Sequence, residues 1–302
     1  MRFDQSGSKS VYGMLKPLKN KQGFITIGST TPRLSHDKSN TEDETGSRVM
    51  VEGWGRSYKK IAIASGKGGV GKTWFAITLS HALANNHRNV LLFDGDLGLA
   101  NVDIQLGLMP KHDLGGVLAG RLPLNQATMV FDEGGFDIIA GRSGSGNLAN
   151  ISASRLNSLN EDLTMLSLSY DHIIFDLGAG VERTVRNLAN QVDTVVVVTT
   201  DEPTALTDAY AFIKLTHMER PNLDLRVVVN MANSTKEGER TYNTILKACQ
   251  GFLKFSPPLA GVIRRDSKVR ETIRNQASIL MRFPNTEAAN DVRSIVDKLL
   301  GQ

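Results

Sequence analysis

The densest group of residues suited to one chemistry is the segment from Gly66 to Thr73, which reads GKGGVGKT. It satisfies the pattern G-x-x-x-x-G-K-[ST], in which glycines let backbone N–H groups converge on phosphate oxygens. An apolar run precedes it and a helical pattern follows, a context that favours a phosphate-binding loop over a plain glycine-rich turn. We predict these nucleotide-binding residues in and directly after the loop: Gly66, Gly68, Gly69, Val70, Gly71, Lys72, Thr73 and Trp74.

Acidic residues follow two later apolar runs. Asp94 and Asp96 come after one run, and Asp176 comes after another. Any one of them could equally serve as a turn or helix-cap residue. In open α/β sheets, however, ligands bind beyond the carboxyl ends of the strands, and an aspartate there commonly supports Mg²⁺. We therefore predict ATP and Mg²⁺ as cofactors, with Thr73, Asp94 and Asp176 as the metal-binding residues.

Apolar runs and helix-length segments alternate along most of the chain. The predicted strands are 60–65, 89–94, 136–140, 172–176, 194–200, 225–230 and 259–263. The predicted helices are 73–85, 154–169, 184–190, 205–219, 237–253, 268–274 and 287–300. Strands buried on both faces that alternate with helices are typical of a parallel sheet. The expected fold is α/β, an open, mainly parallel twisted sheet flanked by helices on both faces.

The first 57 residues have a different character. They show no sustained period of 2 or 3.6, and residues 35–47 contain glycine as their only non-polar type. We predict a flexible tail and linker over 1–57, followed by one ATPase domain over 58–302. Apolar residues among the first twenty could order on a partner or belong to a disordered leader, and the sequence leaves both readings open.

Composition and charge restrict the function classes. The chain of 302 residues carries a formal net charge of +4, of which +3 belongs to residues 1–57. The nearly neutral remainder disfavours general nucleic-acid binding. The single cysteine, Cys249, can form neither an internal disulfide nor the paired ligands of an iron–sulfur cluster. No run approaches the length of a membrane span and no signal peptide is apparent, so we expect a cytoplasmic protein.

Lys67, directly after the first glycine, turns the loop into the variant pattern K-G-G-x-G-K-T. That pattern resembles the deviant phosphate-binding loop of the MinD/ParA group of P-loop ATPases, and the resemblance covers about residues 59–302. Segments 94–103, 201–210 and 230–234 are similar to the flagellar-number regulator branch of that group, known as FlhG, FleN or YlxH.

The resemblance implies roles for single residues. In an ATP-dependent homodimer, Lys67 would cross to the phosphates of the partner subunit, much as an arginine finger does. Lys72 would contact the β- and γ-phosphates, and Asp96 would polarise the attacking water; with Lys67 these are the predicted catalytic residues. Asp176 would support Mg²⁺.

The resemblance also implies which residues contact the adenine base of ATP. Asn230 would hydrogen-bond the adenine edge, and the loop containing Arg264 and Asp266 would wall the ring. For Asn230, the alternative is a turn residue at a strand end, because asparagine serves both purposes well.

The implied function is an ATP-dependent dimerisation switch with slow Mg-ATP hydrolysis that regulates flagellar number or placement. Its partner would be a protein such as a flagellar signal-recognition-type GTPase or a transcriptional regulator. One alternative is a partition-type ATPase that binds DNA nonspecifically as an ATP dimer, for which a cluster of cations is the best support: Arg264, Arg265, Lys268, Arg270 and Arg274. Another alternative is a MinD-like ATPase that positions the division site.

Both ends of the chain bear on membrane and partner binding. Residues 291–300 carry an apolar stripe with two cations, two anions and no aromatic anchor, so we predict a core-packing helix rather than a membrane-targeting one. Peripheral association with the inner membrane would then need the N-terminal tail or a partner. Phe3-Asp4-Gln5 resembles the start of the helix with which this branch activates its GTPase, but the following residues, 6–8, are poor helix formers.

Overall fold

The computed structural model describes residues 59–141 and 151–301. The tail and linker predicted over residues 1–57, including the activator-like start at Phe3, lie outside the described residues. Within the described ranges, no helix combines the length and apolar character needed to cross a membrane.

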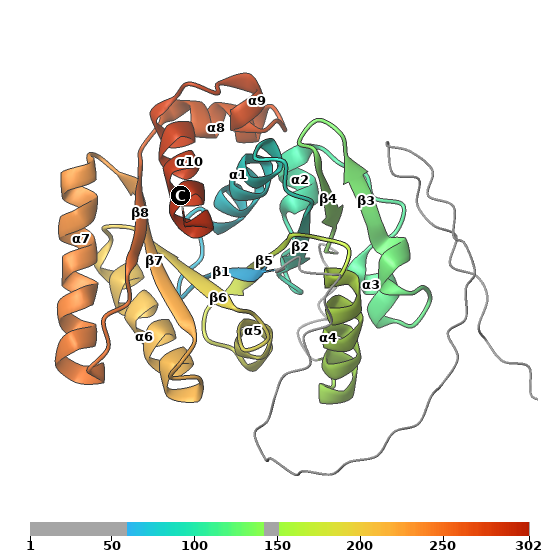
Figure 1. Cartoon of the computed structure of the whole chain (residues 1–302), viewed down its shortest axis with the longest axis horizontal. Helices are drawn as coiled ribbons and strands as arrows, with labels where there is room; N and C mark the ends of the chain where they lie inside the picture. The colour runs from blue at the N-terminus through green and yellow to red at the C-terminus, as the bar shows by residue number, and fades with distance from the viewer. Residues whose placement is uncertain (1–58, 142–150, 302) are drawn as a thin grey trace, which may run out of the picture. The chain divides into compact units, whose positions relative to one another are not determined.

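An eight-stranded sheet lies at the centre of the described domain, in the order β3-β4-β2-β5-β1-β6-β7-β8 (Figure 1). Its strands are β1 (Lys59–Ser65), β2 (Val90–Gly95), β3 (Thr128–Phe131), β4 (Phe136–Ile139), β5 (His172–Ala179), β6 (Thr194–Thr199), β7 (Asp224–Ala232) and β8 (Leu259–Arg264). All neighbouring strands are parallel except β3 and β4. This confirms the predicted open, mainly parallel sheet. The prediction missed β3, a four-residue edge strand with one buried residue, which leaves almost no periodic signal.

Helices cover both faces of the sheet (Figure 1). One layer contains α1 (Lys72–Asn85), α2 (Val102–Leu106), α8 (Ser267–Arg274), α9 (Ile279–Arg282) and α10 (Glu287–Leu300). The other contains α3 (Leu114–Leu118), α4 (Ala153–Ser167), α5 (Arg183–Ala189), α6 (Pro203–Glu219) and α7 (Thr235–Ala248), together with the 3-10 turn η1 (Leu124–Ala127) and the π-helical turn η3 (Cys249–Leu253). The predicted helix 237–253 thus divides into α7 and η3.

Strand side chains alternate between these two layers. In β1, Ile61 and Ile63 join the core beneath α1 and α10, whereas Ala62 and Ala64 join the core beneath α4 to α7. All four are at most 2% exposed. This burial on both faces explains why the strands appear in the sequence as continuous apolar runs.

Helix α10 packs inside the domain. Its apolar stripe is buried against α1 and β8 through six residues: Ala288, Ala289, Val292, Ile295, Val296 and Leu299. The prediction of a core-packing helix is therefore confirmed. Because its apolar face is already covered, α10 does not offer that face to a membrane.

Candidate nucleotide-binding site

The loop between β1 and α1 has the backbone geometry of an anion site. Gly69 and Gly71 adopt φ values of 81° and 88°, in the left-handed region that glycine tolerates best. Gly71 caps α1 without any side-chain hydrogen bond, and the first turn of α1 carries no acidic residue. The first N–H groups of the helix and its positive dipole end are thus available to phosphate.

Close packing fixes both ends of this loop. A Cβ added at Gly66 would lie 2.1 Å from the carbonyl oxygen of Asp208 in α6. A Cβ added at Gly71 would lie 2.4 Å from Nδ2 of Asn230 in β7. The loop is therefore held between two elements distant in sequence, and glycine is required at both contacts.

The pairing of β2 with β5 brings two carboxylates together below the loop. Asp94 stands opposite Asp176 in the ladder, and both side chains are buried, at 0% and 1% exposure. Burial raises the pKa of Asp176, while the Lys72 charge and a hydrogen bond with the Thr73 hydroxyl oppose that rise. Oδ1 of Asp176 has no hydrogen-bond partner within the described part of the chain. An oxygen in that state is suited to a cation or its bound water.

Asp94 has a different set of contacts. Its Oδ1 accepts a hydrogen bond from the N–H of Asp96 at 3.2 Å, and its Oδ2 accepts from the N–H groups of Asn101 and Val102 at 3.1 and 3.2 Å. Burial, and then the charge of Asp176, raise the pKa of Asp94. With both oxygens already engaged, Asp94 holds the loop after β2 in place. This arrangement favours Asp176 over Asp94 as the carboxylate near Mg²⁺.

Asp96 lies at the beginning of that loop and faces the end of β5. One of its oxygens, Oδ1, accepts hydrogen bonds from the N–H groups of Gly98 at 3.3 Å and Leu99 at 3.0 Å. A Cβ added at Gly178 would lie 3.4 Å from the same oxygen. The half-buried carboxylate therefore stands where β2 and β5 end, and its water-orienting role stays a prediction.

The described residues fit Mg²⁺ held jointly with a nucleotide. They contain no group of three His, Cys, Asp or Glu side chains able to hold a metal alone. Mg²⁺ in nucleotide sites usually takes one or two protein oxygens, with phosphates and water completing its shell. Thr73 and Asp176 can supply such oxygens.

Lys67 contacts α6 of its own chain. Its Nζ lies 2.6 Å from Oε2 of Glu202 and 2.7 Å from the hydroxyl of Thr204. The hydrogen bond and charge of Lys67 lower the pKa of Glu202. Glu202 is the residue before α6 and is largely exposed, so the ion pair lies at the surface beside the phosphate loop.

Lys72, Val70 and Trp74 are all buried, at 8%, 3% and 6% exposure. Lys72 begins α1, while Val70 and Trp74 belong to the hydrophobic core beneath it. The indole N–H of Trp74 has no hydrogen-bond partner in the part of the chain that the structure describes. A contact between Trp74 and a nucleotide stays a prediction.

Asn230 connects β7 to the phosphate loop. Its Nδ2 donates to the carbonyl of Val70 at 2.9 Å, and its Oδ1 accepts from the N–H of Met231 at 2.9 Å. One Nδ2 hydrogen is therefore left for a base, so the linking role and the predicted base contact can coexist.

Arg264 and Asp266 stand beside the predicted base site, but their side chains are engaged elsewhere. Arg264 forms a forked ion pair with Asp291 of α10, with Nη2 and Oδ1 2.8 Å apart, and also contacts Glu287. Oδ1 of Asp266 accepts from the N–H of Lys268 at 2.8 Å and caps α8. Both residues also line the cavity at this place, and their contact with a base stays a prediction.

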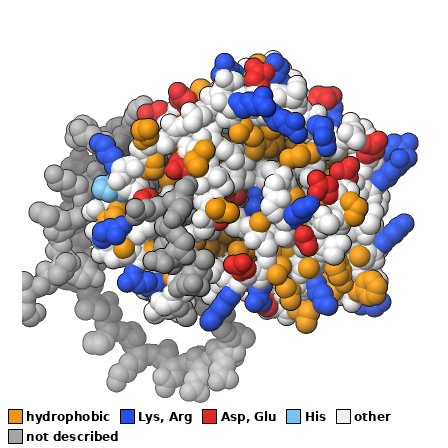
Figure 2. Space-filling view, turned by 180° about the vertical axis from the view of Figure 1, so that it is seen from behind, with side chains coloured by type: hydrophobic (Ala, Val, Ile, Leu, Met, Phe, Trp, Pro, Cys, Tyr) orange, Lys and Arg blue, Asp and Glu red, His pale blue; other side chains and the backbone are white. Residues whose placement is uncertain are grey.

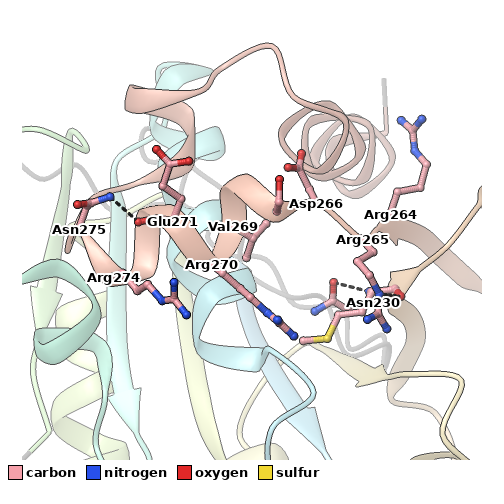
Figure 3. Close-up of a pocket in the computed structure, with 11 residues that line it drawn as sticks. Asn230, Arg264, Arg265, Asp266, Val269, Arg270, Glu271, Arg274 and Asn275 are labelled. Atoms are coloured by element: carbon pink, nitrogen blue, oxygen red, sulfur yellow. Dashed lines mark hydrogen bonds between the residues drawn. The ribbon is translucent and has the colours of Figure 1, made fainter.

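Three other arginines line a cavity of about 830 Å³ at this place: Arg265, Arg270 and Arg274. Figure 3 shows Arg264 directed away from the other labelled side chains, Arg265 beside Asn230, and Arg270 and Arg274 on α8. In the sequence, Arg265 belongs to the loop expected to wall the base, whereas Arg270 and Arg274 appear only as part of a basic cluster considered for DNA. Their common cavity depends on the turn from β8 into α8, which has no sequence signature.

Comparison with known proteins gives a consistent family assignment. The family described as the CobQ/CobB/MinD/ParA nucleotide binding domain matches residues 61–279. The chain is 36% identical over 239 residues to the antiactivator FleN of Pseudomonas aeruginosa, covering 79% of this chain and 85% of FleN. It is 33% identical over 246 residues to the flagellum site-determining protein YlxH of Helicobacter pylori, covering 81% and 82%.

A solved structure agrees with these sequence matches. The septum site-determining protein MinD of Pyrococcus horikoshii, complexed with Mg-ADP, superposes with a TM-score of 0.68 at 25% identity, covering 80% of this chain and 96% of that one. The family match, the phosphate loop and the shared fold together show that this chain belongs to the MinD/ParA family of nucleotide-binding P-loop ATPases.

Proposed function

We propose that this protein is an ATP-dependent dimerisation switch with slow Mg-ATP hydrolysis, which regulates flagellar number or placement through a partner protein. Its relatives FleN and YlxH are named as an antiactivator and a flagellum site-determining protein, and this supports the flagellar part of the proposal. The name of FleN also makes a transcriptional regulator the partner we favour over a GTPase.

The contact of Lys67 with Glu202 and Thr204 carries the switch proposal. A lysine beside the phosphate loop is held here by its own α6, through an ion pair in which the Lys67 and Glu202 side chains are 35% and 62% exposed. Exposed pairs of this kind contribute little to stability, so Lys67 can exchange Glu202 for the phosphates of a second subunit. ATP then favours the dimer because it gains this contact only there.

The remaining roles are those that the motif and the family resemblance imply, and the site geometry supports them. Lys72 and the open N-terminus of α1 bind and orient the triphosphate, and Thr73 with Asp176 would hold Mg²⁺. The metal supplies positive charge that stabilises the transferring phosphoryl group. Asp96 orients the attacking water, and Lys67 from the partner adds a further positive charge.

A DNA-binding role receives less support. Arg264 is paired with Asp291 and Glu287, and Lys268 is paired with Glu271 at 2.8 Å. On the face shown in Figure 2, basic side chains are interspersed with acidic ones rather than gathered into one continuous patch. Nonspecific DNA binding depends on several free cations acting together on phosphates.

The proposal is tested with Asp96→Ala, which should bind ATP but not hydrolyse it. Adding ATP and Mg²⁺ to this variant should double the mass measured by light scattering. Adding Lys67→Ala should keep it monomeric, because the cross-subunit charge is lost. An unchanged mass with and without ATP would refute the switch. A dimer that forms equally well without Lys67 would restrict that residue to catalysis.

A further inference from the structure

The end of α8 carries a glutamine in a backbone conformation that glycine usually adopts. Gln276 has a φ of 51°. Its N–H donates to the carbonyl of Ile273, and the N–H of Ala277 donates to the carbonyl of Thr272, both at 3.1 Å. This pair of hydrogen bonds forms the Schellman motif, whose left-handed position usually holds glycine because glycine has no Cβ. Strain that persists at one position points to a task for the side chain.

The Gln276 side chain reaches α2, a helix of five residues in which Val102 and Leu106 are buried. Nε2 of Gln276 donates to the carbonyl of Ile104 at 3.3 Å. Gly107, which follows α2 with a φ of 66°, packs so closely that a Cβ added there would lie 2.8 Å from Oε1 of Gln276. A helix this short is not stable by itself, so its tertiary contacts determine where its C-terminal end lies.

The segment after Gln276 is anchored to α1. Oγ of Ser278 lies 2.7 Å from Nδ1 of His81, and these two residues are 1% and 5% exposed. Helix α1 begins at Lys72 of the phosphate loop, so the position of Gln276 is tied to the element that carries this loop. Helices α1, α2 and α8 lie together on one face of the sheet (Figure 1). Gln276 therefore joins the short α2 to a fixed frame.

Hydrogen bonds continue from the other end of α2 to Asp96. Asn101, the residue before α2, donates from Nδ2 to the carbonyl of Leu99. The N–H of Leu99 in turn donates to Oδ1 of Asp96 at 3.0 Å. The buried Asp94 accepts from the N–H of Asn101 at 3.1 Å. The loop that carries Asp96 is thus continuous with a helix held by Asp94 at one end and by Gln276 at the other.

We propose that Gln276 is a positioning residue for ATP hydrolysis. By holding the C-terminal end of α2, it fixes the loop before α2 and so orients the Asp96 carboxylate toward the attacking water. This deepens the proposed function and rests on it, because it takes Asp96 as the residue that orients the water. The backbone motif alone favours glycine, and the contact of Nε2 with α2 gives the physical reason for a glutamine.

Two substitutions separate the side chain from the backbone motif. Gln276→Gly removes the contact and relieves the left-handed strain, so it should unfold at the same urea concentration as wild type or a higher one. Its kcat should fall about fivefold, the order of one lost hydrogen bond, with KM for ATP unchanged because no phosphate-binding residue is altered. Gln276→Glu keeps the length of the side chain but loses the donor, and its kcat should fall equally.

Lys254→Gly is the matched control. Lys254 has a φ of 55° after η3, in the other helix layer, so glycine relieves the same kind of strain there without touching α2. Its kcat should equal that of wild type. Rates are compared between samples of equal mass by light scattering, so that a change in assembly is not mistaken for a change in hydrolysis.

Hydrogen exchange gives a second readout that does not depend on hydrolysis. Without nucleotide, the backbone amides of residues 98–106 should exchange about fivefold faster in Gln276→Gly than in wild type, and those of α1 should be unchanged. Unchanged exchange in 98–106 would show that Gln276 does not hold α2. Faster exchange together with a wild-type kcat would show that α2 does not position Asp96. Either result overturns the proposal.

Two further outcomes are distinguishable from these. A lower kcat in Gln276→Gly that accompanies a lower urea midpoint would reduce Gln276 to a structural residue and overturn its positioning role. A wild-type protein that hydrolyses no ATP would contradict the proposed function itself, whereas the exchange measurement would still decide whether Gln276 holds α2.

Discussion

Gly71 allows the geometry of the phosphate loop to be tested through stability. Alanine at this position must adopt a φ of 88°, in the left-handed region, at a cost of about 1–2 kcal/mol. Its Cβ would lie 2.4 Å from Nδ2 of Asn230, an amide that is 4% exposed and donates to Val70 at 2.9 Å. Displacing the amide loses a hydrogen bond of net value about 1 kcal/mol.

Gly71→Ala should therefore lower the free energy of unfolding by about 2–3 kcal/mol, equivalent to roughly 5–10 °C in Tm. Urea unfolding without nucleotide, followed by tryptophan fluorescence, measures this change. Gly68→Ala is the matched control in the same loop, because a Cβ added there would have no atom within 4 Å and its φ is outside the left-handed region. It should change stability by no more than about 0.5 kcal/mol.

Equal losses in the two variants would refute the reasoning, because neither the left-handed backbone nor the contact with Asn230 could then explain the effect. A stable Gly71→Ala protein with wild-type ATP affinity would refute it more directly. Such a protein would show that the loop tolerates a Cβ against β7, and that the link between Asn230 and Val70 is not needed to hold the phosphate site open.

Two other perturbations address the switch and the buried carboxylates. In the Asp96→Ala background, Glu202→Gln should lower the protein concentration at which ATP produces dimer, because Lys67 then breaks no ion pair when it moves to the second subunit. An unchanged concentration at half-dimerisation, measured by light scattering, would contradict this. Without nucleotide or metal, the free energy of unfolding should fall by up to about 2 kcal/mol between pH 6.5 and 8. Burial and the Asp176 charge raise the pKa of Asp94 to about 8. In this pH range the folded protein therefore keeps the Asp94 carboxyl protonated, whereas the unfolded chain has already released that proton. The stability that comes from binding this proton is lost as the pH rises through the folded-state pKa. Urea unfolding should show a flatter profile for Asp94→Asn, and identical profiles for the two proteins would argue against a buried, protonated Asp94.

The sequence alone determined the phosphate loop and the character of the sheet. Eight adjacent residues from Gly66 to Thr73 contain the whole motif, and its meaning depends only on local backbone chemistry and on the strand and helix beside it. Strands such as β1 and β6 are buried on both faces, so each appears as an unbroken apolar run. The edge strand β3 was not predicted, because most of its residues are partly or fully exposed and so form no clear apolar pattern in the sequence.

The contacts made by side chains far apart in the sequence follow from the packing of the folded chain. In the sequence, Asp94 and Asp176 are equivalent acidic residues at strand ends. The hydrogen bonds of the folded chain distinguish them, because Asp94 accepts from three backbone N–H groups, whereas Oδ1 of Asp176 has no hydrogen-bond partner within the described residues. Lys67 pairs with a glutamate 135 positions away. Arg264 and Arg265 are neighbours in sequence and both line the cavity, yet Arg264 pairs with Asp291 of α10 whereas Arg265 donates to the carbonyl of Met231. Such choices depend on which elements the fold packs together, and spacing along the chain does not encode them.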